Sequence, residues 1–179
     1  FKFEDKNKFL IKEYDYKKKI SVSNQTSLNF LNNALATGGY YLEISKNYKF
    51  KKPLVVYNYF SESIKEQIIS YKNSLILNEN SELTILNYTD NNSKNNFFVN
   101  SFDYFKLKKD SNLKRIFINN NRCSCYFHNY LKSDLEQNTN FDNYILSTGL
   151  KFNKIDIEIN LNEEYAKSSI FSALSLGSE

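Results

Sequence analysis

Four stretches of the sequence share one pattern, in which a polar doublet or triplet leads into an apolar residue and then an alternating strand. They read SELTI at residues 81–85, SNLKRI at 111–116, TNFDNYI at 139–145 and EYAKSSI at 164–170. The equivalent apolar residues, spaced by 30, 28 and 25 positions, are Leu83, Leu113, Phe141 and Ala166. Repeats of this length with strands and no helix are typical of a solenoid, whose coils bury their apolar faces against one another.

Short alternating or apolar runs also precede these repeats, from residue 40 onward. They read YLEI at 41–44, LVVY at 54–57 and LIL at 75–77, and the turns between them are rich in Asn, Ser, Lys and Asp. A sandwich or barrel would also contain many short strands, but we would expect more Gly and Pro at its turns than the 4 Gly and 1 Pro found here. The sequence therefore predicts an all-β solenoid of stacked coils.

One short N-terminal capping helix is predicted over residues 26–37. Its apolar positions, at i, i+3 and i+7, are Leu28, Leu31 and Leu35. Asn24 or Thr26 is the expected N-cap, and the glycine pair at 38–39 is expected to supply a left-handed stop.

The composition predicts a single core. The chain has 179 residues, of which 41% are hydrophobic and 25% charged, as in one globular domain. It contains no Met and begins at Phe1, so we expect a fragment. Residues 1–24 then form a truncated N-terminal segment, and residues 25–179 form the solenoid core without its C-terminal part.

Charge and hydropathy give no sign of nucleic acid or membrane as a partner. The net charge is +4, and lysines alternate with acidic residues along the chain. The run Lys17 to Lys19 is interpreted as a solvated linker rather than a phosphate-binding patch. No apolar run approaches the roughly 20 residues that cross a bilayer, and two cysteines do not make a disulfide-rich secreted domain.

Cys123, Cys125 and His128 are the candidate metal ligands. In a regular strand the two cysteines point to one face and His128 to the other, so the three side chains do not converge on one ion. Two thiolates alone leave zinc or iron short of four ligands. We expect core cysteines, with an intermolecular or cluster-related role as the alternative. The same geometry disfavours a nucleophilic Cys–His pair.

No catalytic residue is predicted. Glu43, Asp103 and Asp156 lie in alternating strands, where we expect outward-facing, solvated carboxylates rather than general acids or bases. The chain has no glycine-rich phosphate loop, so any ATP chemistry comes from a partner.

Residues 28–46, LNFLNNALATGGYYLEISK, continued by KPL at 52–54, resemble the SufB/SufD family. The family pattern there is an LN-x-A-F helix, a glycine-bounded turn, a strand ending in I-P-x-G, and P-I opening the next strand. Further similar segments lie at 75–83, 109–113, 147–157 and 161–166. Several turn glycines of the family are Asn here, which keeps the turns feasible because Asn tolerates the left-handed conformation. The Q-N-W segment typical of SufB does not follow Phe117, which favours SufD.

This resemblance implies a right-handed parallel β-helix within the SufBCD complex, which assembles iron–sulfur clusters with energy from the SufC ATPase. It implies a non-catalytic scaffold with SufB-like and SufC-like partners, in the cytoplasm, or in the plastid of a plastid-bearing eukaryote. The chain itself is expected to bind no cofactor, and the cluster is assembled transiently by the whole complex. The family's cluster-proximal residues are expected beyond Glu179, so no site residue is carried over.

Two other functions are compatible with a solenoid alone. A β-helical polysaccharide-active enzyme needs clustered acids, or an Arg or Lys base, on stacked strands, and no such cluster is evident in the sequence. An extracellular β-helix adhesin needs only the repeats.

Overall fold

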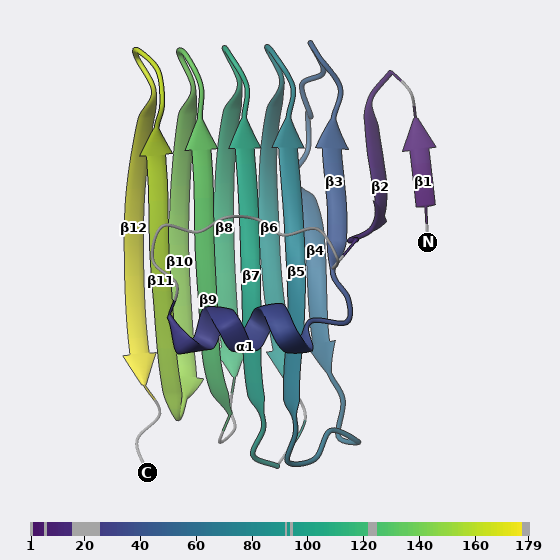
Figure 1. Ribbon diagram of the computed structural model, residues 1–179, viewed down its shortest axis with the longest axis vertical. Coiled ribbons are helices and arrows are strands. Elements are labelled where there is room, and N and C mark those ends of the chain that lie inside the picture. The colour runs from purple at the N-terminus through teal and green to yellow at the C-terminus, as the bar shows by residue number, and fades with distance from the viewer. Residues whose placement is uncertain are drawn as a thin grey trace.

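The computed structural model describes residues 2–5, 7–15, 26–91, 93, 95–121 and 125–176, which coil into a β-solenoid of about four turns. Two sheets face each other across the core (Figure 1). Sheet A has, in order, β1 (Lys2–Asp5), β2 (Phe9–Glu13), β3 (Tyr40–Ile44), β5 (Ile68–Leu77), β7 (Phe98–Leu107), β9 (Tyr126–Leu135) and β11 (Phe152–Leu161). Sheet B has β4 (Leu54–Phe60), β6 (Glu82–Asn91), β8 (Asn112–Asn121), β10 (Asn140–Leu150) and β12 (Lys167–Leu176).

The predicted solenoid is confirmed by the pairing of the strands. From β3 onward, neighbouring strands of sheet A are parallel, and all neighbours in sheet B are parallel. Each coil therefore places one strand in each sheet. The strands β1 and β2 are different, because they extend sheet A beyond β3 in antiparallel pairs.

The strand register confirms three of the four predicted repeat positions. Leu83 pairs with Leu113, and Leu113 pairs with Phe141. The fourth equivalent residue is Ser168 and not Ala166, so that prediction was wrong by two residues. Ala166 comes directly before β12 and packs at the margin of the core, while the small Ser168 takes the inward position.

Each coil turns through one residue with a left-handed backbone. These residues, with φ between 54° and 63°, are Asn47, Asn80, Asp110, Asn138 and Tyr165. Their turns stack, because the amide of Asn80 donates to Lys109 O and the amide of Asn138 donates to Glu164 O, at 3.0 Å each. The expectation that Asn takes the left-handed conformation at these turns is confirmed, since Asn and Asp adopt it more readily than most residues.

The inward side chains form two apolar clusters with a polar layer between them. The first cluster contains twelve buried residues, among them Leu83, Leu113 and Phe141. The second contains Phe117, Phe127 and six others. The two clusters occupy different stretches of the same strands, and polar residues on those strands separate them.

The helix α1 (Ser27–Leu35) lies across the outer face of sheet A, against β5 and β7 (Figure 1). Thr26, one of the two expected N-cap residues, is the N-cap, and its side chain accepts a hydrogen bond from the backbone amide of Asn29. The predicted apolar face was wrong, because the buried residues are Asn29 and Asn32 while Leu35 is 42% exposed. The reason is that Asn32 Nδ2 donates to carbonyl oxygens of both β5 and β7.

The helix ends without help from the glycine pair. Ala36, the C-cap, is extended at φ −66° and ψ 123°. Gly39 instead allows a close approach to β5, because its φ is +127° and a Cβ there would lie 1.7 Å from the carbonyl oxygen of Lys72. The prediction that the glycine pair ends the helix was therefore wrong. Gly39 instead lets the chain pack closely against β5.

The described part of the chain holds no helix that is long and apolar enough to cross a membrane.

Candidate functional site

An ion pair is buried inside the solenoid, in the polar layer between the two apolar clusters. Arg115 on β8 is 1% exposed, and its Nη2 donates to Asp103 Oδ2 on β7 at 2.6 Å. The guanidinium carbon lies 5.4 Å and 4.6 Å from the ring centres of Phe105 and Phe117. Such partners are needed, because an unpaired charge in an apolar interior is very costly.

Asparagine side chains add further contacts to this pair. Asn73 donates to Asp103 Oδ1 at 2.8 Å, and Asn129 donates to Asp103 Oδ2 at 2.9 Å. Asn87 accepts from Arg115 Nε at 3.4 Å. Both carboxylate oxygens are thus occupied by donors from three strands. The arrangement suits a counter-ion that holds the sheets together rather than an acid or base that exchanges protons with a substrate.

The prediction that Asp103 is solvated was wrong, since it is 5% exposed. The inward alternation of β7 through Phe105 and Leu107 carries Asp103 inward with it. Aromatic residues occupy both faces of this strand, so alternation alone does not reveal which face is buried. The signal that was missed is Arg115, one of only two arginines, at an inward position two residues after Leu113.

Two tyrosines face the same polar layer. Burial raises the pKa of Tyr40 and of Tyr71, and the charge of Asp103 raises both further. They therefore remain protonated phenols at neutral pH. Neither is suited to act as a base or a nucleophile.

His128 on β9 lies on the opposite side of sheet A, beneath α1, and is completely buried. Its Nδ1 is 2.9 Å from Asn100 Oδ1, and its Nε2 is 3.0 Å from Asp156 Oδ2. Asn100 in turn donates to Leu28 O of α1, and Lys154 donates to Asp156. These contacts tie the helix to three neighbouring strands.

The ionisation of this pair follows from its burial. Burial lowers the pKa of His128, and the Asp156 carboxylate offsets part of that effect. For Asp156, burial raises the pKa, but the hydrogen bonds from Lys154 and His128 outweigh it and the net pKa is lowered. Because both nitrogens of His128 are engaged, neither is available to activate a nucleophile. The prediction of a solvated carboxylate at Asp156 holds only in part, since its side chain is 28% exposed and paired.

Cys125 lies in the apolar cluster with Phe117, Phe127 and Ile145 and is 1% exposed. His128 is on the other face of sheet A, so these two candidate ligands do not converge. Cys123 lies outside the described residues, as does the lysine run at 17–19. Within the described ranges there is no group of three or more His, Cys, Asp or Glu side chains that could hold a metal ion.

Tyrosine hydroxyls donate to three outward carboxylates of sheet A, which are Glu43, Asp134 and Glu158. Tyr41 donates to Glu43, and Tyr104 donates to Asp134 on the neighbouring strand. Glu43 also accepts from Asn78; burial raises its pKa, but these hydrogen bonds bring the net pKa below the ordinary value. Glu43 is therefore outward-facing, as predicted, but only half-buried and hydrogen-bonded rather than fully solvated.

The comparison with known families gives one match. The family described as "SUF system FeS cluster assembly, SufBD core domain" matches residues 59–179, which is well over half of the chain. The chain belongs to the SufB/SufD family. For this SufB/SufD chain the match runs from the end of β4 through β12, so it spans the coils from β5 onward and leaves out α1, β3 and most of β4. No curated protein matches the chain.

Membership in the SufB/SufD family places the function in iron–sulfur cluster assembly by the SUF system. The resemblance noted in the sequence was carried partly by residues 28–54, which precede the matched range, and partly by segments from 75 to 166, which lie inside it.

Proposed function

We propose that this chain is a SufD-like, non-catalytic scaffold subunit of a SufBCD complex, with a SufB-like subunit and a SufC-like ATPase as partners. The observation that carries the proposal is the SufB/SufD core match on a solenoid whose described Cys and His side chains are committed to internal contacts. The iron–sulfur cluster is then cargo, assembled transiently by the complex. The proposed location is the cytoplasm, or the plastid where the source has one.

The choice of SufD over SufB rests on the central coils. Residues 116–121 read IFINNN, with no Q-N-W segment. In β8 these residues continue a regular ladder to β10, and Asn120 accepts from Thr148 at 3.2 Å. This stretch therefore supports a structural role within the sheet.

Scaffolding is a physically reasonable task for this architecture. Parallel strands of about ten residues pair along their full length with both neighbours, which favours a stiff body with fixed surfaces. At the last coil, Leu161, Ile170 and Leu174 are about half exposed. Exposed apolar side chains beside the edge strands β11 and β12 suit the addition of further strands or a partner there.

The alternatives have less support. A polysaccharide-active enzyme needs exposed acids near the substrate. On the outer face of the stacked coils of sheet A, the carboxylates are instead paired with Tyr, Lys, Asn or His side chains; they are Glu43, Asp134, Asp156 and Glu158. No feature of the described residues favours an adhesin over a SUF subunit.

Depletion of the protein in its native cell tests the proposal. We expect the activity of iron–sulfur enzymes to fall on depletion and to return with wild-type protein. The double variant Cys123→Ser with Cys125→Ala should restore it equally, because a scaffold needs no thiolate chemistry. Unchanged enzyme activity on depletion would contradict a SUF role, and a stably folded double variant that fails to rescue would contradict the non-catalytic role.

A further inference from the structure

The outer face of sheet B carries a band of apolar side chains, which we call the apolar stripe. Its first row is Val55, Leu86, Ile116, Tyr144 and Phe171. Its second row is Tyr57, Tyr88, Ile118, Leu146 and Ala173. Each row takes one residue from every strand of the sheet, from β4 to β12, so the stripe runs continuously across the strands.

From β6 to β12, polar residues border the stripe on both sides, whereas on β4 the half-exposed Tyr59 pairs with Asp90 and widens the stripe. One border, nearer the strand starts, is Thr84, Lys114, Asp142 and Ser169; the other is Asp90, Asn120, Thr148 and Ser175. Two contacts fasten these borders to the stripe: Lys114 Nζ lies 4.9 Å from the ring centre of Tyr144, and Tyr57 donates to Asp90 at 2.9 Å. From β6 to β12 the apolar band is therefore a bounded feature and not a general property of the face.

The stripe is exposed. Val55, Tyr57, Leu146 and Phe171 are between 45% and 56% exposed. The two half-exposed rings of Tyr57 and Phe171 alone present roughly 200 Å², because such side chains offer about 150–250 Å² each. With the rest of both rows, the stripe reaches the size at which an apolar patch on a monomer marks an interaction site.

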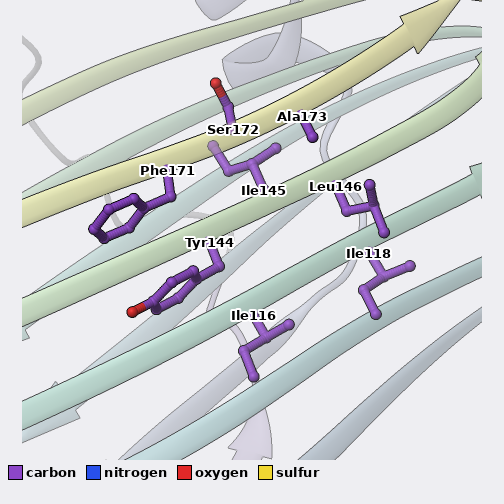
Figure 2. Close-up of a pocket in the computed structure, with 8 residues that line it drawn as sticks. All are labelled: Ile116, Ile118, Tyr144, Ile145, Leu146, Phe171, Ser172 and Ala173. Carbon is purple, nitrogen blue, oxygen red and sulfur yellow. The ribbon is translucent and has the colours of Figure 1, made fainter.

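A hollow lies within the stripe where β8, β10 and β12 run side by side. Its volume is about 320 Å³, and its walls include Ile116, Ile118, Tyr144, Leu146 and Phe171. Figure 2 shows the rings of Tyr144 and Phe171 side by side at one end, and Ile118, Leu146 and Ala173 at the other. The two ring centres are 4.9 Å apart. An open hollow with apolar walls receives a bulky apolar side chain in the manner of an interface anchor.

We propose that the apolar stripe docks an amphipathic α-helix of a partner protein, lying across the strands. The dimensions fit: four strand spacings of about 4.8 Å give a length of roughly 19 Å, or about 13 helical residues, and two rows about 7 Å apart suit a helix about 10 Å in diameter. The helix would present apolar residues at i, i+3 or i+4, and i+7.

Sheet A shows that a helix can lie across the strands of this solenoid, although polar contacts and not an apolar face hold α1 there. On sheet A, α1 already crosses β5 and β7 and is fixed to carbonyl oxygens of both strands through Asn32. A second copy of this chain is a poorer occupant of the stripe. Two flat sheets packed together need about 800 Å² from each partner, which would bring the bordering charges Lys114, Asp142 and Asp90 into the interface. A helix covers the two apolar rows and leaves those charges in water.

Photo-crosslinking in the full-length protein, expressed in its native cell, identifies the occupant. We place p-benzoylphenylalanine at position 146 in the stripe or, as a control, at position 152 on the outer face of sheet A. The expected result is a crosslink from position 146 alone, mapped by mass spectrometry to a segment of another protein with apolar residues at helical spacing. A crosslink to a second copy, to this same chain, to a non-helical segment, or to nothing would overturn the proposal.

A binding measurement with a synthetic peptide of the crosslinked segment tests the contact directly. Phe171→Asp and Phe152→Asp form a matched pair, because each phenylalanine is on an edge strand, is 41–52% exposed and packs on a neighbouring tyrosine. We expect Phe171→Asp to weaken binding more than tenfold and Phe152→Asp less than twofold. Equal effects would overturn the proposal, and the melting temperatures of both variants confirm that they are folded.

Discussion

At the scale of single residues, the most consequential contacts are those of buried ionisable side chains. Arg115 and Asp103 are inside the solenoid, and His128 is buried beneath α1 with Asp156 beside it. Both pairs link different strands, β7 with β8 and β9 with β11. Their contribution is to stability and to the placement of the coils.

Replacing Arg115 by Met should lower the free energy of unfolding by roughly 3–5 kcal/mol, because it leaves the Asp103 carboxylate buried without its counter-ion. Adding Asp103→Asn should restore much of the loss, since the uncompensated charge is then gone. Urea denaturation measures both effects. A double variant no more stable than Arg115→Met would show that the ion pair does not account for the loss.

The stability should also depend on pH through His128. Burial places its pKa in the folded protein below the ordinary 6.5, so the unfolded chain binds a proton more readily. The free energy of unfolding therefore contains the whole contribution of neutral His128 above about pH 6.5. It decreases as the pH falls from there towards the lowered pKa. Because His128 is the only histidine, His128→Gln should flatten the dependence between pH 5 and 7. Equal slopes for the two proteins would contradict this assignment.

At the scale of the elements, the stacked turns define the coil. Four of the five left-handed turn residues are Asn or Asp, and two side-chain amides link successive turns: Asn80 donates to Asn47, and Asn138 donates to Asp110. Tyr165 breaks the series. Its side chain is 71% exposed, so little packing offsets the cost of its left-handed backbone.

Tyr165→Asn should therefore raise the free energy of unfolding by about 1 kcal/mol, because Asn adopts the left-handed conformation at lower cost. Tyr165→Phe is the matched control and should leave stability nearly unchanged, since its backbone preference is the same. Thermal and urea denaturation of the three proteins decide the matter. A less stable Asn variant would mean that the tyrosine side chain stabilises the turn in some other way.

Prediction from sequence succeeded where the pattern was local and repeated. The solenoid follows from alternation and spacing, and the turn asparagines follow from backbone preference. It failed where tertiary contacts decide. Asn32 is buried because its side-chain amide donates to two carbonyl oxygens of β5 and β7. The helix sequence alone does not indicate these partners, because they lie on distant strands. Asp103 is inward because it continues the inward alternation of Phe105 and Leu107, but aromatic residues lie on both faces of β7, so the sequence alone does not show which face is buried.

At the scale of the whole molecule, the two outer faces of the solenoid are different surfaces. Sheet A presents a helix and hydrogen-bonded polar side chains, whereas sheet B presents the apolar stripe. A body with one face covered and another exposed to partners agrees with a scaffold in a larger assembly. Within the SufB/SufD family, that assembly is the SUF machinery.

Affinity purification of the tagged full-length protein from its native cell, under reducing conditions, tests the scaffold role most directly. The account predicts that a SufB-like protein and a SufC-like ATPase are recovered together with it in stoichiometric amounts. Recovery of the intact protein with neither of them would contradict the account.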